Sequence, residues 1–532
     1  MILMLKKMFN HESKSISGGA LVVAVFYLLN GVLALLRNGL LASKFGASQE
    51  LDIYYAAFRI PDFIYVILIS GAISAGFIPL FAEKLSKSKE EAWKFSNNIL
   101  TTLTLILAVG AGIVAIFAPF LVKLIVPGFD LDSQSKVALL VRIMMMQPIL
   151  LGMSNIIVGM LQNFKRFFIT SLAPIFYNLG IIVGIIFFVP MFGLKGLAWG
   201  VVLGALLHFL VQLPSLRNLG FHFKFLPDFG SQNLKQIFYL MVPRMLGLLS
   251  TQINFLIVTI IASGLAKGSL SVFNFANDLQ SLPQNIFAIS FAVAVFPVLA
   301  QLSDKRKEFL QTFSNTTKNI LFFMIPISVL YIVLRELIIR ATLSYGSFDL
   351  SATLAVADVL GIFAIGMVGQ SLLPLMIRLF FAMKDSIRPF LAGLAGNVLS
   401  VVLCWSLSRY FGVRGLALAF VIAGYFNLVL LWSFLRKKMI ISESLGIARS
   451  FSRIIAASTV AGLSVFGILK MLNFSVISTS LILTIIQIMV IAVIFALIHF
   501  GILYFIKAPE LSYLKSIFRM KRKEESIEKF YE

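Results

Sequence analysis

The sequence has little charge and no long polar stretch. Charged residues make up 13% of the 532 residues and hydrophobic residues 59%, and the mean hydropathy is +0.96. Soluble globular domains carry about 25% charged residues, so this composition excludes an ordinary soluble domain. The chain is therefore predicted to be a polytopic membrane protein that is embedded in the bilayer, built from spans of about 20 residues joined by short loops.

Cysteine and histidine are also scarce. The single cysteine, Cys404, lies within an apolar run, so a disulfide framework and a cysteine-based metal site are excluded. The four histidines are scattered along the chain, which argues against a histidine-based metal site. The acidic residues are too few and too dispersed for a recognisable catalytic constellation. We therefore predict no catalytic residue, no metal and no cofactor.

A nucleotide-binding loop of the form G-x-x-x-x-G-K-[ST] is absent as well, which excludes ATP hydrolysis within this chain. The remaining energy sources are an ion gradient and the membrane potential, which does work of about 2.3 kcal/mol per 100 mV on each charge that crosses. The net charge of +22 does not indicate nucleic acid, because the basic residues lie in short loops and form no aromatic-flanked patch.

Long apolar runs account for nearly all of the chain and predict an all-α membrane protein with about fourteen transmembrane helices. The first run follows a basic segment, but it is too long for a signal peptide and is expected to be retained. The predicted helices lie at 17–42, 53–82, 95–120, 137–162, 168–190, 196–216, 236–264, 271–301, 310–340, 352–382, 388–409, 412–435, 452–472 and 477–506.

The basic residues are distributed unevenly between alternate loops. Of the 45 Lys and Arg residues, 30 fall in loops and tails on one side of the predicted membrane and nine on the other. Because lysine and arginine are enriched in cytoplasmic loops, both termini are predicted to be cytoplasmic. The six that remain lie within or at the edge of helices, and all are arginine: Arg37, Arg59, Arg142, Arg244, Arg335 and Arg378.

These embedded arginines have two interpretations. Each one can be a snorkelling or ion-paired residue at a helix end. As a group they favour phosphate recognition, because the planar guanidinium forms bidentate hydrogen bonds to a phosphate.

The chain contains an internal repeat. The sequence GLKGLA at 193–198 recurs as GVRGLA at 412–417, and the same offset places Lys165 on Lys384. Six helices per repeat is an even number, so the two halves share one orientation and are related by a pseudo-twofold axis along the membrane normal. Two such six-helix bundles around a central site are typical of alternating access.

The repeat divides the chain into four predicted parts. Residues 1–218 form an N-terminal six-helix lobe and residues 219–437 a C-terminal six-helix lobe. Residues 438–508 hold helices 13 and 14, which lie outside the repeat, and residues 509–532 form a basic cytoplasmic tail.

Several motifs resemble those of the MurJ (MviN-like) lipid II flippases of the multidrug/oligosaccharidyl-lipid/polysaccharide exporter superfamily. They are LASKFGASQELDIYYAAFRIPD at 41–62, GAISAGFIPLF at 71–81, QIN at 252–254 and RLFFAMKDSIRP at 378–389. The resemblance implies that the chain moves lipid II, an undecaprenyl-diphosphate-linked peptidoglycan precursor, from the inner to the outer leaflet of the bacterial inner (cytoplasmic) membrane. It also implies a central arginine-lined cavity, and a groove for the isoprenoid tail formed by helices 13 and 14.

The resemblance assigns roles to individual residues. Arg37 matches an arginine late in the first helix, Asp52 an aspartate of the F-G-A-x-x-x-x-D segment, and Arg378 an arginine of the tenth helix. Arg59 occupies a position that is usually basic. The departures from the family pattern are Gly31, Tyr65 and Asp278 in place of arginines, Asn38 in place of an acid and Ser70 in place of a glutamate.

We expect Arg59 and Arg244 to replace the missing family arginines. The predicted substrate-binding residues are Arg37, Arg59, Arg244, Arg378, Asp52 and Asn254. Two alternatives stay open at this point. Asn178, Gln252, Asn254 and Asn397 fit sugar hydroxyls, but interhelical hydrogen bonding is the more favoured role. Asp52 and Asp62 fit a structural role in holding neighbouring arginines.

Three rival functions follow from the same residues. A flippase for another polyprenyl-diphosphate-linked glycan has the same requirements as a lipid II flippase. A MATE-like ion-coupled antiporter is expected to carry acids in its cavity, whereas the embedded charges here are mainly arginine. A membrane glycosyltransferase or phosphatase needs a paired-carboxylate, metal or nucleophile constellation, which the sequence lacks.

Overall fold

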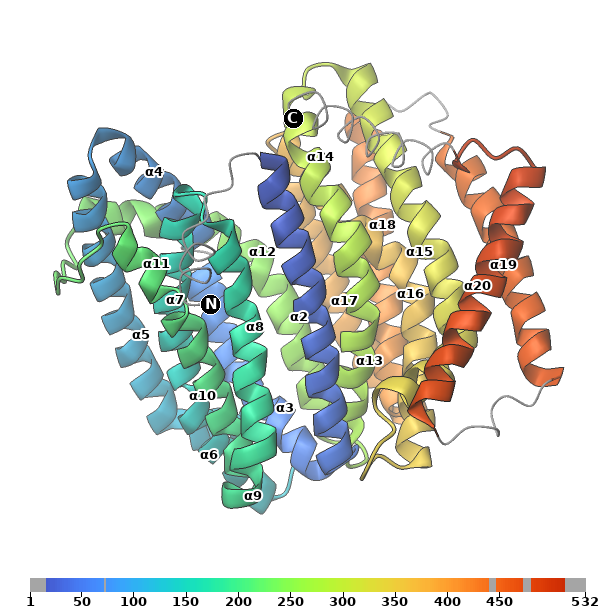
Figure 1. Cartoon of the computed structure of the whole chain (residues 1–532), viewed down its shortest axis with the longest axis horizontal. Helices are drawn as coiled ribbons and strands as arrows, with labels where there is room; N and C mark the ends of the chain where they lie inside the picture. Colours follow the sequence, from blue (N-terminus) through green and yellow to red (C-terminus); the bar gives the residue numbers. More distant parts are fainter. Residues whose placement is uncertain (1–15, 71–72, 440–445, 472–479, 512–532) are drawn as a thin grey trace, which may run out of the picture. The chain divides into compact units, whose positions relative to one another are not determined.

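The computed structural model describes residues 16–70, 73–439, 446–471 and 480–511, and within these ranges the chain is helical and contains no β-strand. The long helices are shown in Figure 1. The chain divides into two compact units. Unit 1 comprises Met1–Asn274 with Tyr345–Asp349, and unit 2 comprises Phe275–Ser344 with Leu350–Glu532. The prediction of an all-α membrane protein is confirmed.

Unit 1 is a bundle of long helices joined by short turns. Three π-helical segments interrupt it, at Tyr65–Ser70, Ile73–Phe77 and Gly184–Phe188. Its α-helices are α2 (Ile16–Phe45), α3 (Gln49–Ile64), α4 (Ile78–Lys87), α5 (Lys89–Ile125), α6 (Leu131–Met144), α7 (Met146–Asn163), α8 (Phe167–Val183), α9 (Val189–Phe192), α10 (Leu194–Leu210), α11 (Leu213–Asn218), α12 (Gln232–Ala262) and the first residues of α13 (Ser269–Pro283).

Close helix packing inside unit 1 depends on glycine. A Cβ atom on Gly180 of α8 would lie 2.3 Å from the Cα of Gly204 on α10, and one on Gly184 would lie 2.4 Å from the Cα of Gly200. Small residues let membrane helices approach each other closely, which strengthens van der Waals packing where water supplies no hydrophobic driving force. This contact fixes the position of α8, which carries Asn178.

Unit 2 continues from α13 through a π-helical segment, Gln284–Ile289. Its further helices are α14 (Ser290–Gln301), α15 (Arg306–Thr342), α16 (Leu350–Ala382), α17 (Ile387–Phe411), α18 (Val413–Met439), α19 (Ile447–Met471) and α20 (Leu481–Phe505). The helices predicted to lie outside the repeat, α19 and α20, pack on α15. Ile325 of α15, Ile454 of α19 and Leu503 of α20 share one apolar cluster.

Twelve helical stretches in the described ranges are long and apolar enough to cross a membrane, and each overlaps one of the predicted runs. The predicted runs at 53–82 and 236–264 are not among the twelve. The first contains α3, two π-helical segments and α4, and the second is α12, of which only Gln252–Ala262 counts as a shorter apolar helix. A multi-span membrane protein is confirmed, and the number of fourteen stays a prediction.

The backbone of the two halves supports the internal repeat. Helices α5 and α15 both have 37 residues and lie at corresponding places in the sequence. Lys165 and Lys384 both have positive φ angles, of 55° and 56°. Gly193 and Gly412 match as well, at 58° and 55°. The predicted boundaries at 218, 437 and 508 follow the repeat and stay predictions, as does the axis that relates the halves.

Candidate functional site

Arg37 is held by amide side chains in the middle of an apolar helix. Its Nη1 donates to Asn178 Oδ1 on α8 at 3.1 Å, and its Nε and Nη2 donate to Asn38 Oδ1 at 3.1 and 2.9 Å. Asn178 in turn donates to Asn30 Oδ1 at 2.9 Å. Asn38 and Asn178 are buried. These amides orient the guanidinium without cancelling its charge, because an amide oxygen is neutral.

Arg59 of α3 is held by the end of α12 and by α13. Its Nε donates to Thr259 Oγ1 and its Nη2 to Asn274 Oδ1, both at 2.8 Å. The guanidinium carbon lies 5.3 Å from the ring centroid of Phe255, which is a cation–π contact. Arg59 therefore joins α3 to α12 and α13 by two hydrogen bonds and one cation–π contact, each with an uncharged group.

Asp62 lies one turn after Arg59 on α3 and within electrostatic range of both Arg59 and Arg37. Gln147 of α7 donates to its Oδ1 at 3.3 Å. Arg37, Arg59 and Asp62 thus form one group inside unit 1, which we call the arginine cluster. With two guanidinium groups and one carboxylate it has a net positive charge when all three are ionised.

Asp52 caps the start of α13. Its carboxylate accepts hydrogen bonds from the Gly268 and Ser271 amides, both at 2.7 Å, and from Ser271 Oγ at 2.5 Å. The side chain is 1% exposed. The first amides of a helix lack partners within the helix, and a carboxylate there also interacts favourably with the helix dipole. The structure thus gives Asp52 backbone amides as partners, where the sequence suggested neighbouring arginines.

The turn beside Asp52 requires glycine. Gly268 has a φ of +87°, and a Cβ atom there would lie 2.1 Å from the Ala47 carbonyl oxygen. The α2–α3 turn and the start of α13 are therefore in direct backbone contact, and the Asp52 carboxylate closes this contact.

The other predicted site residues belong to α16 and α12. Arg378 is on α16 in unit 2, where its Nη1 donates to Pro374 O of its own helix at 3.2 Å. Asn254 is half-buried on α12. Arg244 also belongs to α12, but its side chain lies outside the described part of the structure. The substrate-binding roles of these residues stay predictions.

Sequence reasoning missed most partners of the arginines. Asn30 and Asn38 were given no role in holding Arg37, and Thr259 and Asn274 were given none in holding Arg59. One signal was present: Asn30 and Arg37 are two helical turns apart, which places them on one face of α2. Asn38 is the next residue after Arg37, whereas Asn178, Thr259 and Asn274 are far from the arginines that they hold and carry no local signal.

Comparison with known proteins identifies the family. A family model described as lipid II flippase MurJ matches residues 41–486. The chain belongs to the lipid II flippase MurJ family. A relative from Burkholderia cenocepacia, named lipid II flippase MurJ, is 29% identical over 464 residues, which cover 83% of this chain and 88% of the relative. The family that the motifs predicted is confirmed, and it is a family of flippases and not of enzymes.

Solved structures of the MurJ family and of MATE transporters share this fold. A lipid II flippase MurJ in an inward closed conformation superposes with a TM-score of 0.75 at 24% identity, covering 91% of this chain and all of that chain. An inward-facing MATE family multidrug transporter of the MOP superfamily superposes with a TM-score of 0.66 at 16% identity, covering 79% of this chain and all of that chain. At these identities the likeness establishes the fold alone.

Proposed function

We propose that this MurJ family member is a flippase that moves lipid II from the inner to the outer leaflet of the bacterial cytoplasmic membrane. The observation that carries the proposal is the arginine cluster, in which Arg37 and Arg59 are oriented by neutral side chains within an apolar bundle. The family match over residues 41–486 supplies the substrate class.

The chemistry of the cluster suits a diphosphate. The headgroup must cross about 30 Å of hydrocarbon, where an unsolvated charge is prohibitively costly. A guanidinium offers paired, charge-assisted hydrogen bonds in place of water. The hydrogen bonds from Arg37 to the Asn38 and Asn178 amide oxygens do not neutralise its positive charge, which attracts an anionic ligand. The isoprenoid tail stays in the lipid phase and needs no polar partner.

Asp52 has a different role in this proposal. It ties α3 to the start of α13 through three hydrogen bonds that are buried from solvent. Alternating access requires contacts that form in one state and break in another. We assign Asp52 to such a contact, so that it stabilises one conformation of the cycle and does not touch the lipid.

The source of energy belongs to the proposal as well. No phosphate-binding loop is present in the sequence, so coupling to an ion gradient or to the membrane potential is expected. Both termini are placed in the cytoplasm by the count of Lys and Arg residues in alternate loops. Helices α19 and α20 are assigned to the groove for the isoprenoid tail.

A cellular assay tests this function. Depletion of the protein is expected to lower the amount of lipid II that an externally added, membrane-impermeant probe can reach, while total lipid II rises. Re-expression of the wild type should restore access. If external lipid II is unchanged after depletion and another polyprenyl-diphosphate-linked glycan is retained inside, the substrate is that glycan. If only the efflux of an organic cation changes, a MATE-like antiporter is the function.

A further inference from the structure

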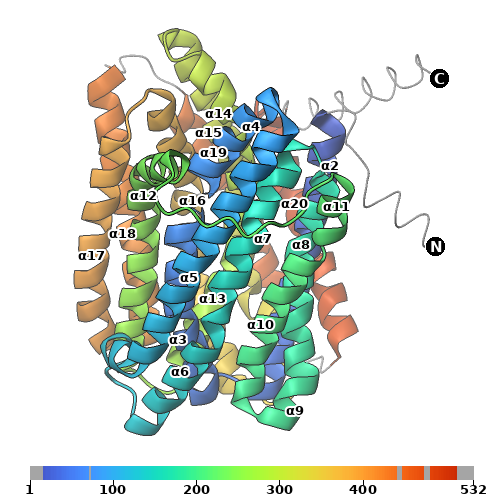
Figure 2. The same cartoon turned by 90° about the vertical axis from the view of Figure 1, so that its left-hand side faces the viewer.

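An extended segment joins α11 to α12 and runs across α5 (Figure 2). We call residues 221–230 the strap. Alternate strap residues bond to polar side chains of α5 through their backbones. The hydrogen bonds are Asn97 Nδ2 to His222 O at 3.1 Å, Lys224 N to Asn97 Oδ1 at 2.8 Å, Asn98 Nδ2 to Leu226 O at 3.1 Å, Leu226 N to Thr101 Oγ1 at 3.4 Å and Asp228 N to Thr102 Oγ1 at 3.1 Å.

The strap exposes three large aromatic side chains. Phe223, Phe225 and Phe229 are 58%, 63% and 59% exposed. Phe221, in contrast, is buried against Trp93, with ring centroids 5.3 Å apart. Because the backbone is fixed to α5, these three rings cannot turn inward without breaking the hydrogen bonds. Clustered exposed apolar groups mark a contact with a partner or with a membrane.

The level of the strap on α5 favours the membrane. Its hydrogen-bond partners, Asn97 to Thr102, lie at the start of the apolar run predicted at 95–120. The following turns of α5 expose the apolar side chains that face lipid in a membrane helix: Val109, Ile113, Ile116, Phe117 and Phe120. The strap is therefore level with the boundary between headgroups and hydrocarbon, where interfacial helices bury apolar side chains such as phenylalanine. A soluble partner would have to compete with lipid there.

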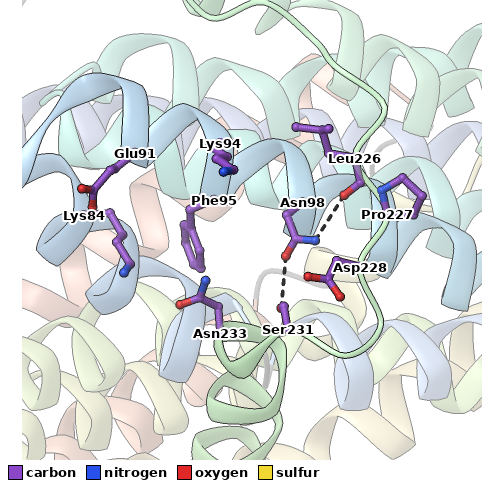
Figure 3. Close-up of a pocket in the computed structure, with 10 residues that line it drawn as sticks. All are labelled: Lys84, Glu91, Lys94, Phe95, Asn98, Leu226, Pro227, Asp228, Ser231 and Asn233. Carbon is purple, nitrogen blue, oxygen red and sulfur yellow. Dashed lines mark hydrogen bonds between the residues drawn. The ribbon is translucent and has the colours of Figure 1, made fainter.

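A pocket adjoins the strap. It has a volume of about 360 Å³ and lies between the strap, α4, α5 and the start of α12 (Figure 3). Lys84 and Lys94 line it, together with Glu91 and Asp228. Within the described residues neither lysine makes an ion pair. Asp228 Oδ1 accepts from the Gly230 amide at 3.0 Å, which leaves its other oxygen for a cation.

We propose that the strap is a lipid contact at the predicted cytoplasmic face, with Phe223, Phe225 and Phe229 seated among the headgroups, and that the pocket receives a zwitterionic phospholipid headgroup. The lysines fit its phosphate and the carboxylates fit its ammonium group. The equal number of positive and negative side chains favours a zwitterion over an anionic headgroup. This site is separate from the arginine cluster and does not depend on the proposed flippase activity.

The depth of the strap can be measured directly, because the chain has one cysteine. In a Cys404→Ala background, Phe225→Cys is labelled with a fluorophore and the protein is reconstituted in vesicles of phosphatidylethanolamine and phosphatidylglycerol. The matched control is Ser86→Cys on α4, an exposed position outside the predicted runs. We expect nitroxide-labelled lipid to quench the label at 225 several-fold more than the label at 86, and aqueous iodide to show the reverse. Equal quenching at both positions by both quenchers would overturn the lipid contact.

The headgroup is tested by native mass spectrometry of protein released from the same vesicles. Wild type is expected to retain phosphatidylethanolamine in preference to phosphatidylglycerol, and Lys84→Gln/Lys94→Gln is expected to lose this preference. Lys87→Gln is the control, because Lys87 lies on the same helix but pairs with Glu83. Retention by the double variant equal to wild type, or a preference of wild type for phosphatidylglycerol, would overturn the headgroup assignment. A thermal unfolding curve verifies that each variant is folded.

Discussion

At the residue scale, Arg37 and Arg59 are held in the same way despite their different surroundings. Both guanidinium groups donate to side-chain oxygens that carry no charge. Most embedded charges in membrane proteins are paired, because an isolated one is costly. Asp62 is within electrostatic range of both. We propose that an anionic ligand binds to this cluster, whose two guanidinium groups and one carboxylate carry a net positive charge when all three are ionised.

Replacing an amide that holds Arg37 by a carboxylate tests whether Arg37 binds an anionic ligand. Asn178→Asp keeps the acceptor oxygen but places a negative charge 3.1 Å from Arg37 Nη1. We expect the affinity for undecaprenyl diphosphate, measured on purified protein, to fall roughly tenfold to a hundredfold, since a hydrogen bond to a charged group contributes about 1.5–3 kcal/mol. Asn163→Asp, at an asparagine bonded to its own helix, is the control. Wild-type affinity in Asn178→Asp would contradict the role of Arg37.

The Asp52 cap makes a second prediction at this scale. Asp52→Asn replaces one acceptor oxygen by an NH₂ group that faces backbone amides. We expect a loss of about 1–3 kcal/mol in the free energy of unfolding, because a buried donor is left unsatisfied. Asp130→Asn is a matched control: Asp130 caps α6 through the Ser133 amide at 2.7 Å but is exposed, and aspartate and asparagine cap about equally well there. Equal losses in both variants would argue against a special role for the buried cap.

At the element scale, the position of α8 depends on its glycine contact with α10. Gly180→Ala would push Cβ against the Gly204 backbone. We expect a destabilisation of about 1–3 kcal/mol, as for other overpacked sites, and a weaker affinity for undecaprenyl diphosphate, because α8 carries the Asn178 that holds Arg37. Gly110→Ala on α5, where no atom lies within 4 Å of the added Cβ, should leave both quantities unchanged. Wild-type affinity in Gly180→Ala would show that the contact between α8 and α10 does not affect how Asn178 holds Arg37.

The turn between α16 and α17 gives a pH-dependent prediction. Burial alone would raise the pKa of Asp385, but hydrogen bonds from Lys438 and from the Arg388 amide, together with the two positive charges, lower it below its usual 3.8. The Arg388 and Lys438 nitrogens lie 2.7 and 2.8 Å from Asp385 Oδ2.

The lowered pKa of Asp385 determines how the stability of the protein changes with pH. A carboxyl group whose pKa is lower in the folded state adds stability above its unfolded pKa, and this stability is lost as the pH falls through the folded pKa. Unfolding temperatures measured from neutral pH to below 3.8 should therefore fall less steeply in Asp385→Asn than in wild type. Parallel curves for the two proteins would show that Asp385 is not a source of acid sensitivity.

At the scale of the whole molecule, the sequence predicted the features that depend on local composition, such as the membrane-spanning helices. Apolar runs located all twelve candidate spans, because a stretch of about 20 apolar residues is a local property. The repeat was visible because short segments recur at a fixed offset, and Lys165 and Lys384, which that offset pairs, share a positive φ angle. Contacts between distant residues were not visible: nothing near Asp52 in the sequence points to Gly268.

For the candidate site, too, the sequence predicted the features with a local signal and missed the contacts between distant residues. Arg37 and Arg59 were singled out because they are charges in apolar runs, which is a local signal. The partner that orients Arg37, Asn178, lies 141 residues away, and sequence reasoning assigned it to sugar hydroxyls or interhelical hydrogen bonds. Tertiary packing decides which polar groups meet, so the chemistry of the cluster required the structure.

The central claim is that Arg37 carries the diphosphate of a lipid-linked precursor across the membrane. Its most direct test is the rate at which purified protein, reconstituted in vesicles under a membrane potential, exposes fluorescent lipid II to an external quencher. We expect rapid exposure by wild type, almost none by Arg37→Ala, and a wild-type rate from Arg142→Ala, an exposed arginine whose Nε bonds to Ala115 O. Exposure by Arg37→Ala at the wild-type rate would contradict the account.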